Sequence, residues 1–170
     1  MRLYSGRVPT VAADIVKKLV DGGDIDVSNR NEAELDVQSV LKEYLRVDRE
    51  ISDQARQMLE QRGLGGEHFG RTRRALAELR GLGQGDEAIP WISNQLIETF
   101  MQSPHIDEVF ADDGMLRVRL REILLKHMAV DDELDGEARR RIQNLQEGTS
   151  AWEIEYARAM AEIKRGRGLE

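Results

Sequence analysis

Apolar residues recur at helical spacing along most of the chain. Pro9 suits the first turn of a helix, and Gly22 and Gly23 suit its end. The apolar face between these signals comprises Val11, Ile15, Val16, Leu19 and Val20. The seam of a second predicted helix comprises Ala33, Val37, Val40, Tyr44 and Val47. Polar residues over 48–53 predict a break, and the face of a short third helix comprises Ile51, Ala55, Met58 and Leu59.

The same pattern occurs again in the second half of the chain. The segment SVLKEYLRVDREISDQAR at 39–56 returns as EILLKHMAVDDELDGEAR at 122–139, 83 positions later. Pro90 suits the first turn of the first helix in the second half. The seam of the next predicted helix comprises Leu116, Leu120, Ile123, His127 and Val130. Because the apolar registers of three successive predicted helices match, we interpret the chain as a duplicated helical unit.

Two segments lie outside this pattern. Residues 63–88 are rich in glycine and arginine, and they predict a linker that holds one short helix. Ser150 and Glu153 form a capping box for a terminal helix without a counterpart in the first half. We therefore predict an all-α protein with an N-terminal three-helix repeat over 1–62, a Gly/Arg-rich linker over 63–88, and a C-terminal three-helix repeat with an added terminal helix over 89–170.

Charge and composition restrict the partners and the compartment. The 170 residues carry a net charge of −7, with 40% hydrophobic and 34% charged residues. An acidic chain is a poor long-range match to nucleic acid or anionic lipid. The absence of cysteine excludes disulfides and thiolate chemistry, and the charged residues within the apolar runs exclude a membrane span. A cytoplasmic protein without membrane contact is the expectation.

Three motifs resemble functional sites but lack essential parts. The acidic run DDELDGE at 131–137 imitates a calcium loop, but Ile142 stands where the bidentate acid is required. His68, His105 and His127 show no metal-binding spacing, and His127 at a seam position reads as a packing residue. The glycines of GLGGEHFG follow no strand, as a phosphate cradle would require. We therefore predict no catalytic, metal-binding or cofactor-binding residues, and no enzyme activity.

Two binding hypotheses remain. In the first, the chain contacts a protein partner or a second copy of itself through the aromatic face of the terminal helix, formed by Trp152, Tyr156, Met160 and Ile163. In the alternative, it attaches to RNA or the ribosome through the linker arginines and the basic tail, formed by Arg71, Arg73, Arg74, Lys164, Arg165 and Arg167. The net charge favours the first hypothesis.

Four segments give the chain a family resemblance. These are MRLYSGRV, ELDVQSVLKEYLRVDREISDQAR, REILLKHMAVDDELDGEAR and EGTSAWEIEYARAMAEIKRGRGL. Together they resemble a small bacterial family known as domain of unknown function 507, and the closing Glu147–Trp152 pattern is their most specific part. Ala151 is a mild departure from that pattern, because the family has a charged residue there. The resemblance implies a bacterial, cytoplasmic, helical protein and assigns no catalytic residue.

Overall fold

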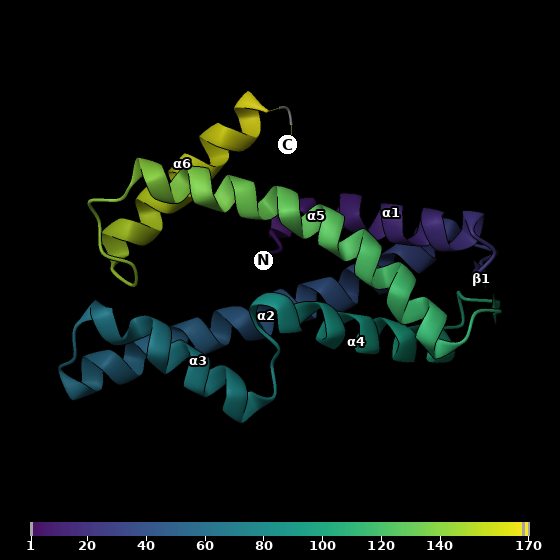
Figure 1. The fold of residues 1–170 in the computed structure, drawn as a ribbon, viewed down its shortest axis with the longest axis horizontal. Coiled ribbons are helices and arrows are strands. Elements are labelled where there is room, and N and C mark those ends of the chain that lie inside the picture. Colours follow the sequence, from purple (N-terminus) through teal and green to yellow (C-terminus); the bar gives the residue numbers. More distant parts are fainter. Residues whose placement is uncertain (1, 168, 170) are drawn as a thin grey trace.

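The structure, a computed structural model, describes residues 2–167 and 169 and is almost entirely helical (Figure 1). The first half contains α1 (Val8–Asp21), β1 (Ile25–Asp26), α2 (Arg30–Arg62) and α3 (Phe69–Arg80). The second half contains α4 (Ala88–Gln102), β2 (Glu108–Val109), α5 (Asp113–Arg141) and α6 (Ser150–Gly166). Short 3-10 turns precede α1, α3 and α4 at Ser5–Arg7, Gly66–His68 and Gly85–Glu87. The predicted all-α class is confirmed.

Local sequence signals account for most helix ends. Pro9 lies in the first turn of α1, and the side chain of Asn29 caps α2 by accepting a hydrogen bond from the backbone N–H of Glu32 at 3.2 Å. Gly63 ends α2 with φ of 62°, a conformation that favours glycine. The cap of α6 is Thr149 rather than Ser150, because Thr149 Oγ1 accepts from the N–H of Trp152. The cap thus lies one residue earlier than predicted, and the predicted capping box does not form, because Trp152 rather than Glu153 is the third residue after the cap.

The predicted break over 48–53 is wrong, because α2 runs through it without interruption. Ile51 and Ala55 continue the buried face, and the Ser52 hydroxyl donates to the carbonyl of Asp48 at 3.1 Å within the helix. The stretch holds no proline or glycine, so the backbone ladder is not disturbed. The matching region of α5 is also continuous. The second and third helices of each predicted three-helix repeat are therefore one long helix.

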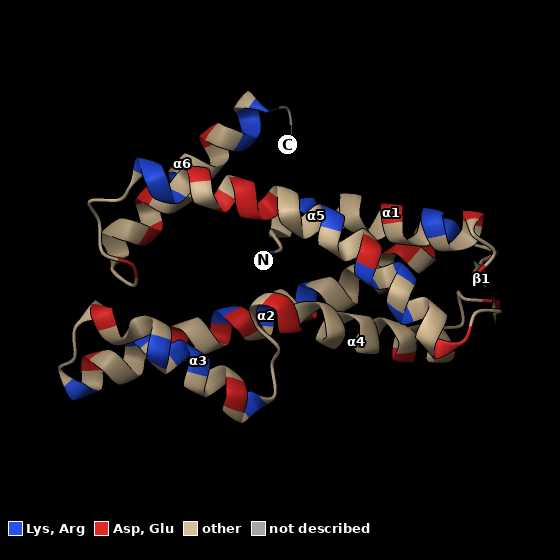
Figure 2. Ribbon diagram, viewed as in Figure 1, with Lys and Arg blue, Asp and Glu red and all other residues tan. Residues whose placement is uncertain are grey.

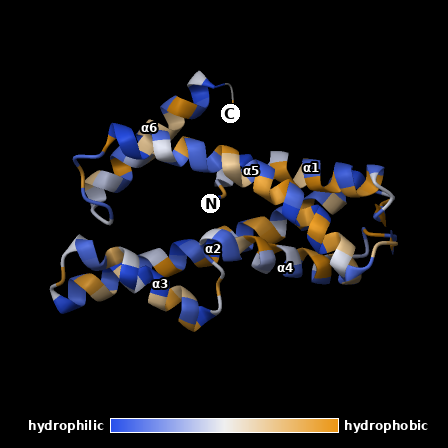
Figure 3. Ribbon diagram, in the orientation of Figure 1, coloured by the Kyte–Doolittle hydropathy of each residue, from blue (hydrophilic) through white to orange (hydrophobic). Residues whose placement is uncertain are grey.

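The two halves share one hydrophobic core. It is built from α1, α4 and the first parts of α2 and α5, where Figure 3 shows most of the hydrophobic residues. Its fully buried side chains include Ile15, Leu41, Leu96 and Leu120. At one end, β1 and β2 pair antiparallel with Ile25 opposite Val109, which ties the two inter-helix loops together. We call this part of the molecule the base.

Beyond the base, α2 and α5 diverge and each carries a returning helix (Figure 1). The α2–α3 arm comprises residues 44–80, and the α5–α6 arm comprises residues 127–166. The predicted linker helix α3 packs along α2 and buries Phe69 and Ala77. Because α3 follows α2 as α6 follows α5, the expectation that the terminal helix lacks a counterpart is wrong.

Candidate functional site

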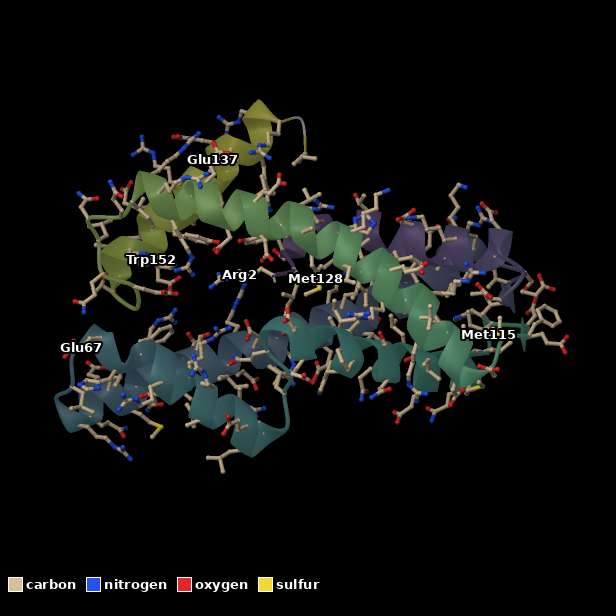
Figure 4. The ribbon with its side chains drawn as sticks, in the orientation of Figure 1. Arg2, Glu67, Met115, Met128, Glu137 and Trp152 are labelled. Atoms are coloured by element: carbon tan, nitrogen blue, oxygen red, sulfur yellow. The ribbon has the colours of Figure 1, made fainter. Side chains whose placement is uncertain are left out.

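A cleft of about 450 Å³ separates the two arms, and we call it the interarm cleft. Its lining residues are Arg2, Leu3, Tyr4, Ser5, Tyr44, Leu45, Asp48, Arg49, Ser52, Asp53, Arg56, Phe69, Arg73, Gln84, Gly85, Glu147, Trp152, Glu153 and Tyr156. Figure 4 shows Arg2 between the arms, with Trp152 on the α5–α6 arm and Glu67 at the tip of the other arm. Guanidinium groups, carboxylates and aromatic rings therefore face one space.

On the α2–α3 wall, the charged side chains are already paired. Arg73 Nη2 donates to Asp48 Oδ1 at 2.6 Å, and Arg73 Nε donates to Ser52 Oγ at 3.0 Å. The Gln84 amide also donates to Asp48 Oδ1 at 3.3 Å, which ties this wall to the segment before α4. Arg49 is exposed at the cleft and forms no hydrogen bond or ion pair within the described part of the chain. Arg49 is thus an unpaired cation available to a ligand.

On the side of the cleft formed by the α5–α6 arm, Arg139 contacts two carboxylates and two aromatic rings. Its guanidinium donates to Glu147 at 2.9 and 3.1 Å and to Asp135 at 2.9 Å. It also lies over the Trp152 ring at 5.2 Å, and that ring stacks on Tyr156 with centroids 4.7 Å apart. The hydrogen bond from Arg139 holds the pKa of Glu147 below its usual range, against the effect of burial. The charged groups around Arg139 are therefore paired within this arm.

The N-terminal segment forms the floor of the cleft. The Tyr4 and Tyr156 hydroxyls are 2.6 Å apart, and Tyr156 donates to Asp135 at 2.5 Å. Burial, together with the bond to Asp135, raises the pKa of Tyr156 to about 12. Burial would raise the pKa of Asp135 as well, but the Tyr156 bond and the charges of Arg2 and Arg139 hold it below its usual range. Both tyrosines therefore stay protonated at neutral pH, while Asp135 stays ionised.

A buried polar chain behind the floor fixes this segment to α5. Arg7 Nη1 lies 3.1 Å from the fully buried Asp131 carboxylate, which also accepts from the N–H of Tyr4 at 3.2 Å. Arg7 donates to Nδ1 of His127 at 2.9 Å, so the Nε2–H of His127 donates to Asp14 at 2.8 Å. Burial raises the pKa of Asp131 to about 6, although Arg7 opposes this effect. The predicted packing role of His127 is thus incomplete, because both ring nitrogens are hydrogen-bonded.

The four predicted partner-binding residues do not form an exposed apolar patch. Met160 and Ile163 are buried against α5, in a cluster with Leu134 and Ala138. Trp152 is buried and Tyr156 is half-buried, and both line the interarm cleft. As partner-binding residues the four stay a prediction. The burial of Met160 and Ile163 speaks against it, whereas the position of Trp152 and Tyr156 at the cleft agrees with it.

The six predicted nucleic-acid contacts do not share one surface role. Arg73 is paired within the cleft, and Lys164 is half-buried over the Tyr4 ring, where burial lowers its pKa. Arg167 donates to Glu137 at 2.8 Å. The remaining side chains are exposed, and they are Arg71 and Arg74 on α3 and Arg165 on α6. Figure 2 shows that acidic residues lie between and around these basic positions on both arms.

Sequence reasoning missed the contact that each arm makes between an arginine and an aromatic ring. Arg56 lies over the Phe69 ring at 5.6 Å, just as Arg139 lies over Trp152. In both halves the ring follows the arginine by 13 positions, and the two pairs are 83 positions apart. The offset of 83 positions between the two copies of the repeated segment therefore also relates α3 to α6. This regularity was present in the sequence, but the glycines and arginines around Phe69 concealed it.

A family model described as "Protein of unknown function (DUF507)" matches residues 1–169. The chain belongs to the DUF507 family. The match includes the arms as well as the base, so the interarm cleft lies within the part of the chain that the family model covers. A comparison with curated proteins finds no match.

Two further observations describe this DUF507 chain. No helix in the described residues combines the length and the apolar character needed to cross a membrane. Within residues 2–167 and 169, no three His, Cys, Asp or Glu side chains converge as metal ligands would. The polar groups of the cleft include arginines, carboxylates and tyrosines, a set suited to recognition by hydrogen bonds and ion pairs.

Proposed function

We propose that this chain is a non-catalytic interaction module that holds a segment of a protein partner, or of a second copy, in the interarm cleft. One observation carries the proposal: the cleft has the volume of a typical ligand site and presents aromatic and charged groups together. The mixture of guanidinium groups and rings is typical of residues that dominate protein interfaces. A cytoplasmic setting and a duplicated origin of the two halves belong to the same proposal.

The hydrogen-bonding pattern supports a binding role over catalysis. His127 is held between Arg7 and Asp14, and His105 Nδ1 lies 3.0 Å from Asp36. His68 lies 3.6 Å from Glu67 at the tip of the α2–α3 arm. Ser103 lies beside His105, but only the backbone N–H of His105 donates to Ser103 Oγ, and the Ser103 hydroxyl donates to Asp36. In the described hydrogen bonds no imidazole nitrogen therefore contacts a serine or threonine hydroxyl, as a catalytic base would.

Site-specific photo-crosslinking tests the proposal. A photoreactive residue replacing Arg49 in the cleft is expected to capture one discrete protein in cells, or a second copy of the chain. The matched control replaces Arg121, an exposed arginine of the base outside the cleft, and is expected to capture no such species. Purified partner should then protect the cleft residues from hydrogen exchange. The absence of capture at position 49, together with a strictly monomeric mass in solution, would count against the proposal.

The RNA alternative rests on the exposed pair Arg71 and Arg74, which are three positions apart on α3 and so share a face. Phosphate contact would give binding that weakens with salt and with Arg71→Gln and Arg74→Gln together. Arg73→Gln disrupts the cleft instead, because this arginine holds Asp48. Salt-independent binding, or no binding to single-stranded RNA in a shift assay, would exclude this alternative.

A further inference from the structure

Apolar packing holds each arm together but does not join the arms to each other. Leu134, Ala138 and Met160 cluster between α5 and α6, while Leu59 and Phe69 cluster between α2 and α3. Among the described residues, neither helix of one arm packs along a helix of the other. Burial of apolar surface therefore fixes α3 on α2 and α6 on α5, and leaves the seam between the arms to other interactions.

The seam at the arm tips is mainly polar. Arg56 Nη2 donates to the carboxylate of Glu153, and Gln146 Nε2 lies 3.5 Å from Glu67 Oε2. The backbone at Gly148 also approaches the Phe69 ring, since a Cβ at Gly148 would lie 3.4 Å from Phe69 Cγ. Ion pairs between side chains that remain partly in water are weak and are screened by salt.

Arg56 keeps its other interactions when its hydrogen bond to Glu153 breaks. It keeps the ion pair with Asp53 at 2.7 Å and its place over the Phe69 ring, both within its own arm. Its Nε is buried without a hydrogen-bond partner among the described residues, so separation of the arms lets water satisfy it. The Glu153 side chain is already 44% exposed and is readily hydrated.

We propose that the two arms form a clamp that the Arg56–Glu153 pair latches shut, and that the interarm cleft opens when this pair is broken. Gentle bending distributed along the long helices α2 and α5 suffices for the motion, because the separate apolar cluster of each arm stays intact while Ile51 and Ala77 remain in the shared core. The clamp is a property of the free chain, so it stands or falls separately from the proposed partner.

Distances between spin labels on the two arms test the clamp. The chain has no cysteine, so Arg62→Cys at the end of α2 and Arg140→Cys in the last turn of α5 accept labels specifically. Pulsed electron spin resonance on the full chain should show a closed and an open population. Glu153→Gln should raise the ratio of open to closed by about two- to fivefold, the range expected for one exposed ion pair.

The matched control is Glu155→Gln, which removes a carboxylate of the same helix that makes no ion pair with the described residues. This variant should leave the distance distribution unchanged. Raising the salt concentration should increase the open population of the otherwise unmodified labelled chain and have little effect in Glu153→Gln. A single narrow distance that responds neither to Glu153→Gln nor to salt would overturn the proposal, as would an equal response to Glu155→Gln.

Discussion

Each arm contains an arginine that lies over an aromatic ring, but only one of these two arginines also contacts the other arm. In each arm an arginine of the long helix lies over a ring of the returning helix, Arg56 over Phe69 and Arg139 over Trp152. Both carboxylates bound by Arg139 belong to its own arm, whereas Arg56 also bonds Glu153 across the cleft. Arg139 therefore stabilises contacts within its own arm, whereas Arg56, at the corresponding position, also links the two arms. The location of the neighbouring carboxylates decides which role each arginine has.

The arms also differ in how firmly the returning helix is attached. In the α5–α6 arm the buried residues of α6 are Trp152, Ala159, Met160 and Ile163. In the α2–α3 arm α3 buries only Phe69 and Ala77, and its Leu79 is 83% exposed. Because stabilisation follows the apolar area removed from water, we expect α6 to be held more tightly than α3.

Removal of the two rings should give the largest effects. Trp152→Ala is expected to lower the free energy of unfolding by about 3–5 kcal/mol, because a packed ring leaves a cavity. Phe69→Ala should cost less, because Phe69 lacks an equivalent of the stack between Trp152 and Tyr156. Urea denaturation measures both values, with Leu79→Ala as a control for an exposed side chain. A greater loss for Phe69→Ala would contradict the ranking of the arms.

The buried Asp131 should make stability depend on pH. Its pKa of about 6 in the folded chain exceeds the ordinary value, so the folded state binds the extra proton, and this stabilisation is lost as pH rises through about 6. Relative to Asp131→Asn, the free energy of unfolding of the unmodified chain should fall by up to about 3 kcal/mol between acidic and neutral pH.

Urea denaturation across this pH range measures the difference between the two chains. Glu122→Gln, which removes an exposed carboxylate earlier in the same helix, controls for the change in net charge. Asp132 is unsuitable as a control because its charge itself raises the pKa of Asp131. If the free energy of unfolding of the unmodified chain, relative to Asp131→Asn, stays constant or rises between acidic and neutral pH, then the pairing of Asp131 with Arg7 outweighs the effect of burial.

Truncation of the two arginines separates the contacts that Arg139 makes within its arm from the contact that Arg56 makes between the arms. Arg139→Ala should cost about 2 kcal/mol, because the more distant Arg2 is then the remaining ion-pair partner of the Asp135 and Glu147 carboxylates, although Asp135 keeps its hydrogen bond from Tyr156. Arg56→Ala should cost about 1 kcal/mol or less, because Asp53 and Glu153 are more exposed and regain water. Equal losses in urea denaturation would show that Arg56 contributes as much to the fold as Arg139 does.

The smallest effect should come at Gly65, one of two glycines that are 83 positions apart, the other being Gly148. Gly148→Ala is expected to cost about 1 kcal/mol or more, because φ is 90° and the new Cβ meets the Phe69 ring. Gly65→Ala should cost less, because its φ is −77° and the new Cβ meets only the mobile end of Glu67. Thermal unfolding of the two variants gives the comparison, and a lower melting temperature for Gly65→Ala would reverse it.

Sequence reasoning found the elements whose signals are local. The apolar face of α1, its start near Pro9 and its end at Gly22 all agree with the prediction. It failed over 48–53, where polar side chains suggested a break although only proline or glycine disturbs the backbone ladder strongly. It also missed Arg56 and Phe69, whose spacing equals that of Arg139 and Trp152.

The helical class, the apolar registers and most helix ends of this DUF507 chain can be predicted from its sequence, because they depend on residues within a few turns of one another. The shared core of the two halves, the folding back of α3 and α6 as arms, and the common cleft of Arg2, Arg49 and Trp152 become visible in the folded chain alone. These features join residues up to about 150 positions apart, and their geometry depends on the angle at which α2 and α5 diverge, which helical periodicity does not encode.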